Sequence, residues 1–599
     1  MDRHYRGAGP EIGIADQSVE LPAGFDDARV DEAKTVSLFR AIAVVFSVRV
    51  GQSRAPYVRY EWLQRGSATP QTTSFWTSRT NSLAFEGQGA SLIAVTAVIA
   101  PVRLSHTDYP IRLLLCDGRT PASAPVQTSF SLDPLSSGAM LDESLIQRTL
   151  TEALSRGGDL AELFVEQRSS TALRLDDSRV EDVASGREAG AGVRVISGER
   201  ASYAYTNLVT EEGLREAARA ARAGLSGAEG AVATDLRRSQ GPQHPVEISP
   251  EEVGAAAKAE ALGQANEAAR AQGAAVRQVS ASYADVHQRV LIASSDGRVA
   301  EDDRTRVRFV VQVVASKDGE IATGFEAPGH SGGFELLSVH SPSDLGERAA
   351  RKALRMLEAR PSPAGEFPVV LAPGSGGVLI HEACGHGLEA DTLVKEASVY
   401  AKRSGERFGS ESVTIVDDGS DGGAWGSFGV DDEGIPAQRT VLFDKGVLVG
   451  HMSDLLSAAK IGHPPTGNGR RQSYAHLPIV RMTNTYLLPG PDDPEAIFDG
   501  VERGVYAATF AGGEVNPATG NFVFGMSEAY MIENGAISHP IKGANLIGNG
   551  PRVLEVIEAV GSDFDRKEGV CGKDGQAAPV TNGMPTVLLG RVTVGGTET

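Results

Sequence analysis

A proline- and glycine-rich segment, RPSPAG at residues 360–365, separates two parts of the chain that have different hydrophobic patterns. In the first part, amphipathic helix patterns such as residues 211–223 and 250–272 alternate with strand-like apolar runs. In the second part, many short strand-like runs are joined by turn residues. Because proline ends a helix and exposes a connector, we place a domain boundary here. The chain is predicted to be an α+β protein, with an α/β region over residues 141–365 and a β-rich region over residues 366–599.

Three shorter patterns in the first part predict individual elements. Residues 141–156 have the periodicity of an amphipathic helix, and residues 162–167 have that of a strand. Residues 173–197 contain apolar runs interrupted by glycine, which indicates short strands joined by glycine turns.

Residues 1–139 differ in composition from the rest of the chain. Of their 13 basic residues, 12 are arginine, and residues 67–82 are rich in serine and threonine. Periodic patterns are weak there. The segment therefore fits a small accessory domain, a disordered leader, or a leader ahead of Met140 that results from a wrongly assigned start, and the sequence leaves these alternatives open.

Charge and cysteine content limit the possible partners and location. The formal net charge is −20, which argues against nucleic acid as a partner because phosphate binding needs a basic surface. Only three cysteines occur, far apart in sequence, so a reducing cytoplasm is expected rather than a disulfide framework. The most apolar stretches, residues 41–48 and 92–100, are far shorter than the roughly 20 residues of a membrane-spanning helix, and the N-terminus does not resemble a secretory signal.

Two histidines flank a glutamate in the motif His381-Glu382-x-x-x-His386, within a helix pattern over residues 378–389. Five steps of about 100° separate the two imidazoles by roughly 140°, so a regular α-helix places them on different faces. One inserted residue, as in a π-bulge, restores a shared face. Gly385 lies where this distortion is easiest, because glycine adopts backbone angles that other residues resist. We therefore expect a bulged or broken helix; the alternative is two core histidines without a functional role.

A shared face makes His381 and His386 candidate zinc ligands, because zinc accepts imidazole nitrogen and a catalytic zinc keeps three protein ligands and one water. Glu382 is then the candidate general base that activates the zinc-bound water for attack on a peptide carbonyl. The third ligand must come from elsewhere in the chain. Cys571 is the first choice, because a thiolate in a glycine-flanked turn approaches a metal without crowding. Cys384 is the second, because it should project away from the face that the two histidines share.

The segment GNGRRQSY at residues 467–474 contains a pair of arginines beside flexible backbone. Paired guanidinium groups can hold a peptide carboxylate through charge-assisted hydrogen bonds. Arg470 and Arg471 are therefore candidate substrate-binding residues, with a purely structural role as the alternative.

Residues 141–599 resemble the TldD/PmbA metallopeptidase family, and within it the metal-bearing, TldD-like members. Five ordered segments have this similarity: HEACGHGLEAD at 381–391, VTIVDDG at 413–419, GNGRRQSYAHLPIVRMTNTYLLPG at 467–490, FVFGMSEAYMIENG at 522–535 and VCGKDGQ at 570–576. Several motifs in order over most of the chain are far more specific than the histidine motif alone. Residues 1–139 lie outside the resemblance.

The resemblance implies a site, a substrate and a partner. In TldD-like proteins the two motif histidines and the later cysteine bind Zn²⁺ and the glutamate is catalytic, which carries over to His381, His386, Cys571 and Glu382. The family implies a zinc peptidase that degrades unfolded peptides or matures peptide precursors. It also implies a related TldE (PmbA)-like subunit that lacks the metal motif. The implied architecture, an α/β region followed by a β-rich catalytic region, agrees with the patterns above.

Two other hypotheses stay open at this point. In a zinc-stabilised, non-catalytic scaffold, Glu382 is structural and protein closes the fourth coordination position. A dipeptidyl peptidase III-like exopeptidase shares the HExxGH spacing but takes its third ligand from a glutamate on a second helix. No EExxxE-like helical segment stands out after the motif.

Overall fold

The computed structural model describes residues 44–46, 57–59, 140–225, 230–233 and 235–597. The chain divides into two compact units, Met1–Ser131 and Leu132–Thr599. In the first unit, β1 (Val44–Phe46) and β2 (Tyr57–Arg59) pair antiparallel. Apart from these two strands, the accessory domain or leader expected over residues 1–139 lies outside the described residues.

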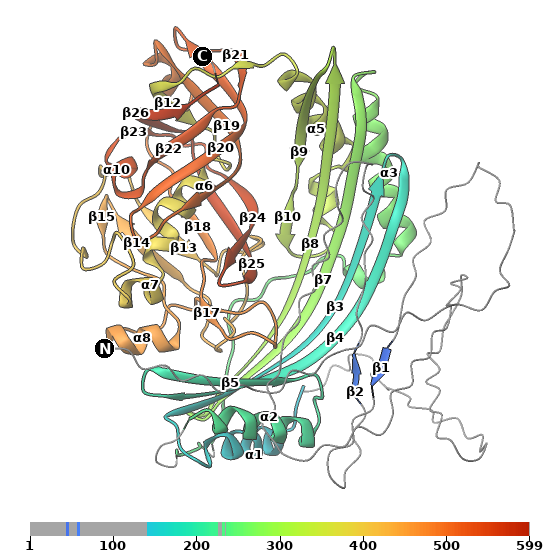
Figure 1. Ribbon diagram of the computed structural model, residues 1–599, viewed down its shortest axis with the longest axis vertical. Helices are drawn as coiled ribbons and strands as arrows, with labels where there is room; N and C mark the ends of the chain where they lie inside the picture. The colour runs from blue at the N-terminus through green and yellow to red at the C-terminus, as the bar shows by residue number, and fades with distance from the viewer. Residues whose placement is uncertain (1–43, 47–56, 60–139, 226–229, 234, 598–599) are drawn as a thin grey trace, which may run out of the picture. The chain divides into compact units, whose positions relative to one another are not determined.

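The first part of the second unit is built on an eight-stranded sheet with four very long strands (Figure 1). The strand order is β10-β8-β7-β3-β4-β5, and β6 and β9 also pair with β8. The bounds are β3 Leu160–Asp176, β4 Arg179–Ser197, β5 Arg200–Thr206, β6 Arg237–Ser239, β7 Val276–Ser294, β8 Arg298–Lys317, β9 Glu320–Glu326 and β10 Gly329–Ser331.

Strand β4 corrects the short strands and glycine turns that we expected over residues 173–197. It is unbroken over Arg179–Ser197 and pairs with β3 along nearly its whole length. Its first ten residues are exposed, so they lack the alternation of apolar and polar residues that marks a half-buried strand. Backbone pairing with β3 therefore defines the strand where the side chains give no signal.

Helices cover parts of this sheet. α1 (Glu143–Leu154) and α2 (Glu211–Ala223) share a buried core with β3 and β4, whereas α3 (Ala255–Arg270) and α5 (Pro342–Met356) pack on β7 and β8. Two short helical elements precede the second pair of helices: η1 (Pro250–Glu252) comes before α3, and α4 (Leu336–Val339) comes before α5. The bounds of α2 agree with the prediction, because the Thr210 side chain accepts a hydrogen bond from the Gly213 amide and two glutamates occupy the first turn.

The second part is rich in strands, which confirms the predicted α+β class with a β-rich C-terminal region. One sheet has the order β11-β21-β20-β19-β12-β26-β22, with β23 also pairing with β26, and another has the order β15-β14-β13-β18-β25-β24; β16 and β17 form a separate pair. The main hydrophobic core contains residues of both sheets. Among the helices that the structure describes, none combines the length and apolar composition that crossing a membrane requires.

The strands of this part are β11 Arg360–Pro361, β12 Gly365–Leu371, β13 Ile415–Asp418, β14 Arg439–Asp444, β15 Val447–Leu448, β16 Gly469–Arg470, β17 Ile479–Val480, β18 Asn484–Leu487, β19 Arg503–Val515, β20 Asn521–Glu533, β21 Ala536–Lys542, β22 Asn545–Asn549, β23 Ile557–Val560, β24 Asp565–Lys573, β25 Gln576–Met584 and β26 Val587–Gly595. Its helical elements are α6 Gly377–Ile380, η2 His381–Gly385, η3 His386–Leu388, α7 Ala390–Val394, α8 Leu455–Ile461, α9 Ala496–Asp499 and α10 Gly550–Glu555.

Candidate metal centre

The histidine motif lies on a helical segment that changes its pitch. α6 continues into η2, which is a π-helical turn, and the backbone N–H of His386 donates to the carbonyl oxygen of His381 five residues earlier. The wider turn brings the two imidazole rings to a centroid separation of 5.0 Å. The structure thus confirms the expected distortion, and the spacing of five residues is the reason for it.

Gly385 supports this turn in a different way from the one we expected. Its φ of −55° is an ordinary helical value, so the backbone freedom of glycine is not used. Instead, a methyl group at this position would lie 2.0 Å from Sδ of buried Met482. The turn is held further by the Tyr400 hydroxyl, which donates to the carbonyl oxygen of Ala383 at 2.8 Å.

The π-helical turn also packs tightly against α10, and this contact gives a stability prediction. A methyl group at Gly550 would lie 2.3 Å from the carbonyl oxygen of Ala383, so backbone has to move. Gly550→Ala is expected to lower the free energy of unfolding by about 1–3 kcal/mol, as overpacking does. The matched control is Gly263→Ala in α3, where the added methyl group meets nothing within 4 Å. Chemical denaturation should show a stability equal to or above that of the wild type for the control, and equal stability of the two variants would contradict the packing argument.

Cys571 lies opposite the histidines, on strand β24 rather than in the turn that we expected from its glycine neighbours. Its Sγ is 3.4 Å from Nε2 of His386, and one ligand atom each of His381, His386 and Cys571 lie within 4.8 Å of one another. A strand can present the thiol here because β24 lies at the edge of its sheet and pairs only with β25 among the described strands.

Cys384, the second choice for the third ligand, points elsewhere. It is fully buried in the hydrophobic core, where the Tyr400 hydroxyl lies 3.9 Å from its sulfur. Burial raises the pKa of the Cys384 thiol to about 12, only partly opposed by this contact. An apolar site that keeps the thiol protonated is unsuited to a metal, which is bound by the thiolate.

The surroundings of Cys571 change its thiol pKa in the opposite direction to those of Cys384, and this favours the thiolate that a metal binds. Burial alone raises the pKa of this thiol, but hydrogen bonds and charges of His381 and His386 outweigh burial and lower the pKa to about 4. The Nδ1 atom of His381 is buried and has no hydrogen-bond partner in the described part of the chain. Two imidazoles and one thiolate, with one ligand atom of each within 4.8 Å of the others, form a donor set that suits Zn²⁺.

Glu382 lies beside these three residues without joining them. Its Oε2 is 3.9 Å from Nε2 of His386, and its side chain is 17% exposed. Burial raises the pKa of Glu382, and the neighbouring histidines oppose this rise in part. A carboxylate with a raised pKa next to a metal-ligand set is suited to accept and return a proton.

The four residues line a cleft of about 1310 Å³ between the two parts of the second unit. One wall contains residues of β9 and α5, such as Phe325 and Lys352, and the other contains residues of β19 and the whole of β24. This volume is large enough for a segment of peptide, so a substrate can reach Glu382 and the ligand set from the cleft.

Comparisons with known proteins identify the family of this chain. Three successive family models match: PmbA/TldA metallopeptidase domain 1 over residues 161–224, the central domain over 248–357 and the C-terminal domain over 364–596. The metalloprotease TldD homolog of Haemophilus influenzae is 38% identical over 455 residues, which cover 74% of this chain and 94% of that protein. The chain belongs to the PmbA/TldD metallopeptidase family.

A further relative and a solved structure differ in what they show. The zinc metalloprotease TldD homolog of Saccharolobus solfataricus is 30% identical over 315 residues, which cover 52% of this chain and 70% of that protein. The crystal structure of TldE from Thermococcus kodakarensis has a TM-score of 0.63 at 20% identity and covers 76% of this chain and 100% of that one. At this identity the TldE structure shows the shared fold alone.

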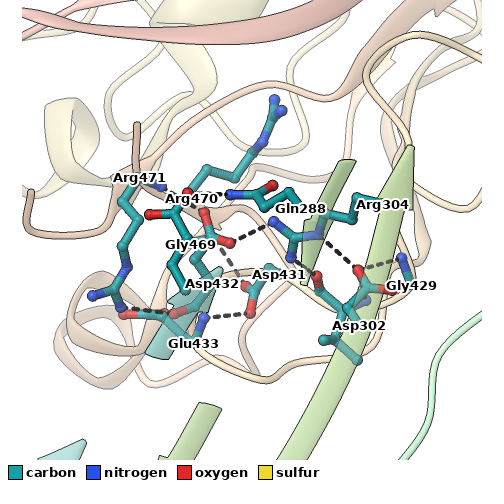
Figure 2. Close-up of polar contacts among 12 residues, drawn as sticks. Gln288, Asp302, Arg304, Gly429, Asp431, Asp432, Glu433, Gly469, Arg470 and Arg471 are labelled. Carbon is teal, nitrogen blue, oxygen red and sulfur yellow. Dashed lines mark hydrogen bonds and ion pairs between the residues drawn. The ribbon is translucent and has the colours of Figure 1, made fainter. Parts of the chain in front are cut away.

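Arg470 and Arg471 do not have the position that a substrate-binding role requires, because neither lines the cleft. They are only 5% and 7% exposed. Arg471 donates to Oε1 of Glu162 at 2.6 Å and to the carbonyl oxygen of Asp432 at 2.7 Å, and Arg470 donates to two backbone carbonyls. Figure 2 shows both arginines within a polar network around Asp431. The terminal nitrogens of both arginines donate to groups inside the protein, which favours the structural alternative over the expected substrate-binding role.

This network joins the two parts of the second unit. Arg304 of β8 donates to Oδ1 of Asp432 at 2.7 Å and to the carbonyl oxygen of Val430 at 2.6 Å (Figure 2). Asp302, also on β8, accepts a hydrogen bond from the Gly429 amide at 2.9 Å. The acidic segment that contains Asp431 and Asp432 therefore fixes the β-rich part of this family member to the long-stranded sheet.

Proposed function

We propose that this chain is a zinc metallopeptidase that hydrolyses peptide bonds in unfolded peptides or peptide precursors. His381, His386 and Cys571 would hold the zinc. The observation that supports this most strongly is the convergence of one ligand atom from each of these residues within 4.8 Å, beside Glu382 and at the wall of a large cleft. The name of the Saccharolobus relative, a zinc metalloprotease, supports zinc as the metal.

The chain's own residues supply the proton transfers. Zinc, when bound, provides a Lewis acid that polarises the peptide carbonyl and lowers the pKa of water. Glu382 faces the cleft close to His386, where it accepts a proton from the attacking water. Its raised pKa then favours delivery of that proton to the nitrogen of the leaving amine. The cleft walls provide the surface that would hold the peptide beside Glu382.

Two features favour a catalytic site over the alternatives. A structural zinc site is closed by four protein ligands, whereas only three potential ligand residues converge in the described part of the chain. A dipeptidyl peptidase III-like site needs a glutamate as the third ligand. Here the nearest candidate for the third ligand is Cys571, whose Sγ is 3.4 Å from Nε2 of His386, whereas Glu389 contacts the opposite nitrogen of that ring at 2.9 Å.

A related subunit and a reducing location complete the proposal. TldE shares the fold of this chain, and a TldE (PmbA)-like paralogue without the metal motif is the proposed partner. Cys384 and Cys571 are free thiols, and a cytoplasmic location would keep Cys571 available as a thiolate.

The proposed function is tested by purifying the chain without chelators, alone and with the candidate paralogue. Metal analysis should find about one zinc per chain, as a three-ligand catalytic site requires. Mass spectrometry of unfolded peptides should show cleavage that a chelator abolishes and added zinc restores. A chain that contains no transition metal, and gains no activity when zinc is added, contradicts the proposal.

A further inference from the structure

A chain of polar contacts extends from His386 to the strand that contains Cys571. Nδ1 of His386 lies 2.9 Å from Oε2 of Glu389, and Nζ of Lys573 lies 3.1 Å from the same oxygen. Lys573 also donates to Oδ1 of Asp391 at 2.8 Å. Because a carboxylate only accepts hydrogen bonds, Nδ1 of His386 is the donor to Glu389, and Nε2 is the ring nitrogen that faces Cys571.

The middle of this chain of contacts is buried, and backbone hydrogen bonds hold it in place. Glu389 is 1% exposed, and the backbone on either side of it is held by Met452, whose carbonyl accepts from Ala390 at 2.8 Å and whose amide donates to Leu388 at 2.9 Å. The ammonium group of Lys573 has three N–H donors. Glu389, Asp391 and the carbonyl oxygen of Val480, at 3.0 Å, provide an acceptor for each of them.

Lys573 lies on the same strand as Cys571, so it links the buried Glu389 to the strand that contains the thiol. Lys573 follows Cys571 by two residues on β24, and residues two apart on a strand point to the same face. The same face of β24 therefore presents both the thiol and the ammonium group to the histidine segment.

We infer that Glu389, Lys573 and Asp391 form a positioning network that fixes His386 and the Cys571 strand relative to each other for metal binding. The inference rests on the proposed zinc site and assigns roles to three residues that do not touch the metal. Lys573 neutralises the buried carboxylate of Glu389 and ties β24 to the segment that follows the motif. Asp391 accepts a second hydrogen bond from the ammonium group of Lys573 and so fixes its position.

The test is zinc affinity, measured by competition with a chromophoric chelator in the full chain. Lys573→Met removes the ammonium group but keeps the length of the side chain, and it should weaken zinc binding about 10- to 100-fold, as changes behind metal ligands do. Lys573→Arg retains charge and donors and should recover most of the loss. The matched control is Lys567→Met, on the same strand and in the same cleft, where no hydrogen bond or ion pair to Glu389 or Asp391 exists in the described residues.

A second readout separates positioning from mere stability. Cobalt-substituted Lys573→Met should have an altered visible spectrum at full occupancy, because the imidazole and thiolate change orientation around the metal. Wild-type zinc affinity with an unchanged cobalt spectrum overturns the inference, even if the melting temperature falls. If Lys573→Met does not fold, Glu389→Gln provides the same two measurements with a change of equal volume.

A wild-type chain that binds no zinc overturns this inference together with the proposed function, whereas zinc binding without peptide cleavage overturns the peptidase proposal alone.

Discussion

Glu382→Gln is expected to keep its zinc while peptide cleavage falls by about 10²-fold or more, because the group that accepts the proton of water is lost. The amide has nearly the volume of the carboxylate, and Glu382 is not one of the three residues whose ligand atoms converge. The metal should therefore be unaffected. The measurement is zinc content together with the rate of cleavage of an unfolded peptide.

The control for this variant is the same substitution at an exposed site. Glu396→Gln lies just after α7, where Glu396 pairs with Lys402 at the surface. It should have wild-type zinc content and activity. Near-normal cleavage by Glu382→Gln would show that another residue is the base or that the zinc is structural.

Cys571→Ala should lose zinc and activity together. Without the thiolate, only two imidazoles are left to hold the ion, and a further coordination position opens to solvent. Metal content after dialysis and peptide cleavage should both fall toward background. Addition of excess zinc should restore activity only in part, because the altered ligand set changes the site as well as its affinity.

Cys384→Ala is the matched variant for this experiment. Its thiol is fully buried in the core and away from the ligand set, so the variant should lose some stability but keep zinc. The opposite result, with zinc retained by Cys571→Ala and lost by Cys384→Ala, would assign the third ligand to the cysteine within the motif.

The local geometry of the motif could be predicted from the sequence because few backbone conformations bring two histidines at this spacing to one face. Two histidines five residues apart can share a face only if the helix is distorted, and the π-helical turn over His381–Gly385 provides that distortion. Helix α2 was equally predictable, since its apolar periodicity, its Thr210 cap and its acidic first turn all agree. In both cases neighbouring residues contain the complete signal.

The sequence was less informative where the role of a residue depends on burial or on partners that are distant in the chain. The sequence made Arg470 and Arg471 candidates for substrate binding, but Arg471 is bound to a carboxylate about three hundred residues away in the chain, that of Glu162. The nearness of Cys571 to His386 likewise depends on a contact across 185 residues. No local pattern specifies such a contact. The resemblance to the family was the stronger reason to choose Cys571 as the third ligand.

Glu389 and Lys573 received no role from the sequence although both lie inside recognisable motifs. A signal was present: Glu389 is three residues after His386, within reach of its side chain, and Lys573 is two residues after Cys571 on a strand. What was missing was the knowledge that the two segments lie side by side. Spacing within each segment is readable, whereas the pairing of segments is set by the whole fold.

X-ray absorption at the zinc edge of the purified chain tests whether zinc is held by two imidazoles and one thiolate. The expected coordination shell has nitrogen at about 2.0–2.1 Å and a single sulfur at about 2.3 Å. The sulfur contribution should disappear in any zinc that Cys571→Ala retains, and it should persist in Cys384→Ala. A wild-type spectrum with only nitrogen and oxygen neighbours, or with two sulfurs, would contradict the proposed ligand set.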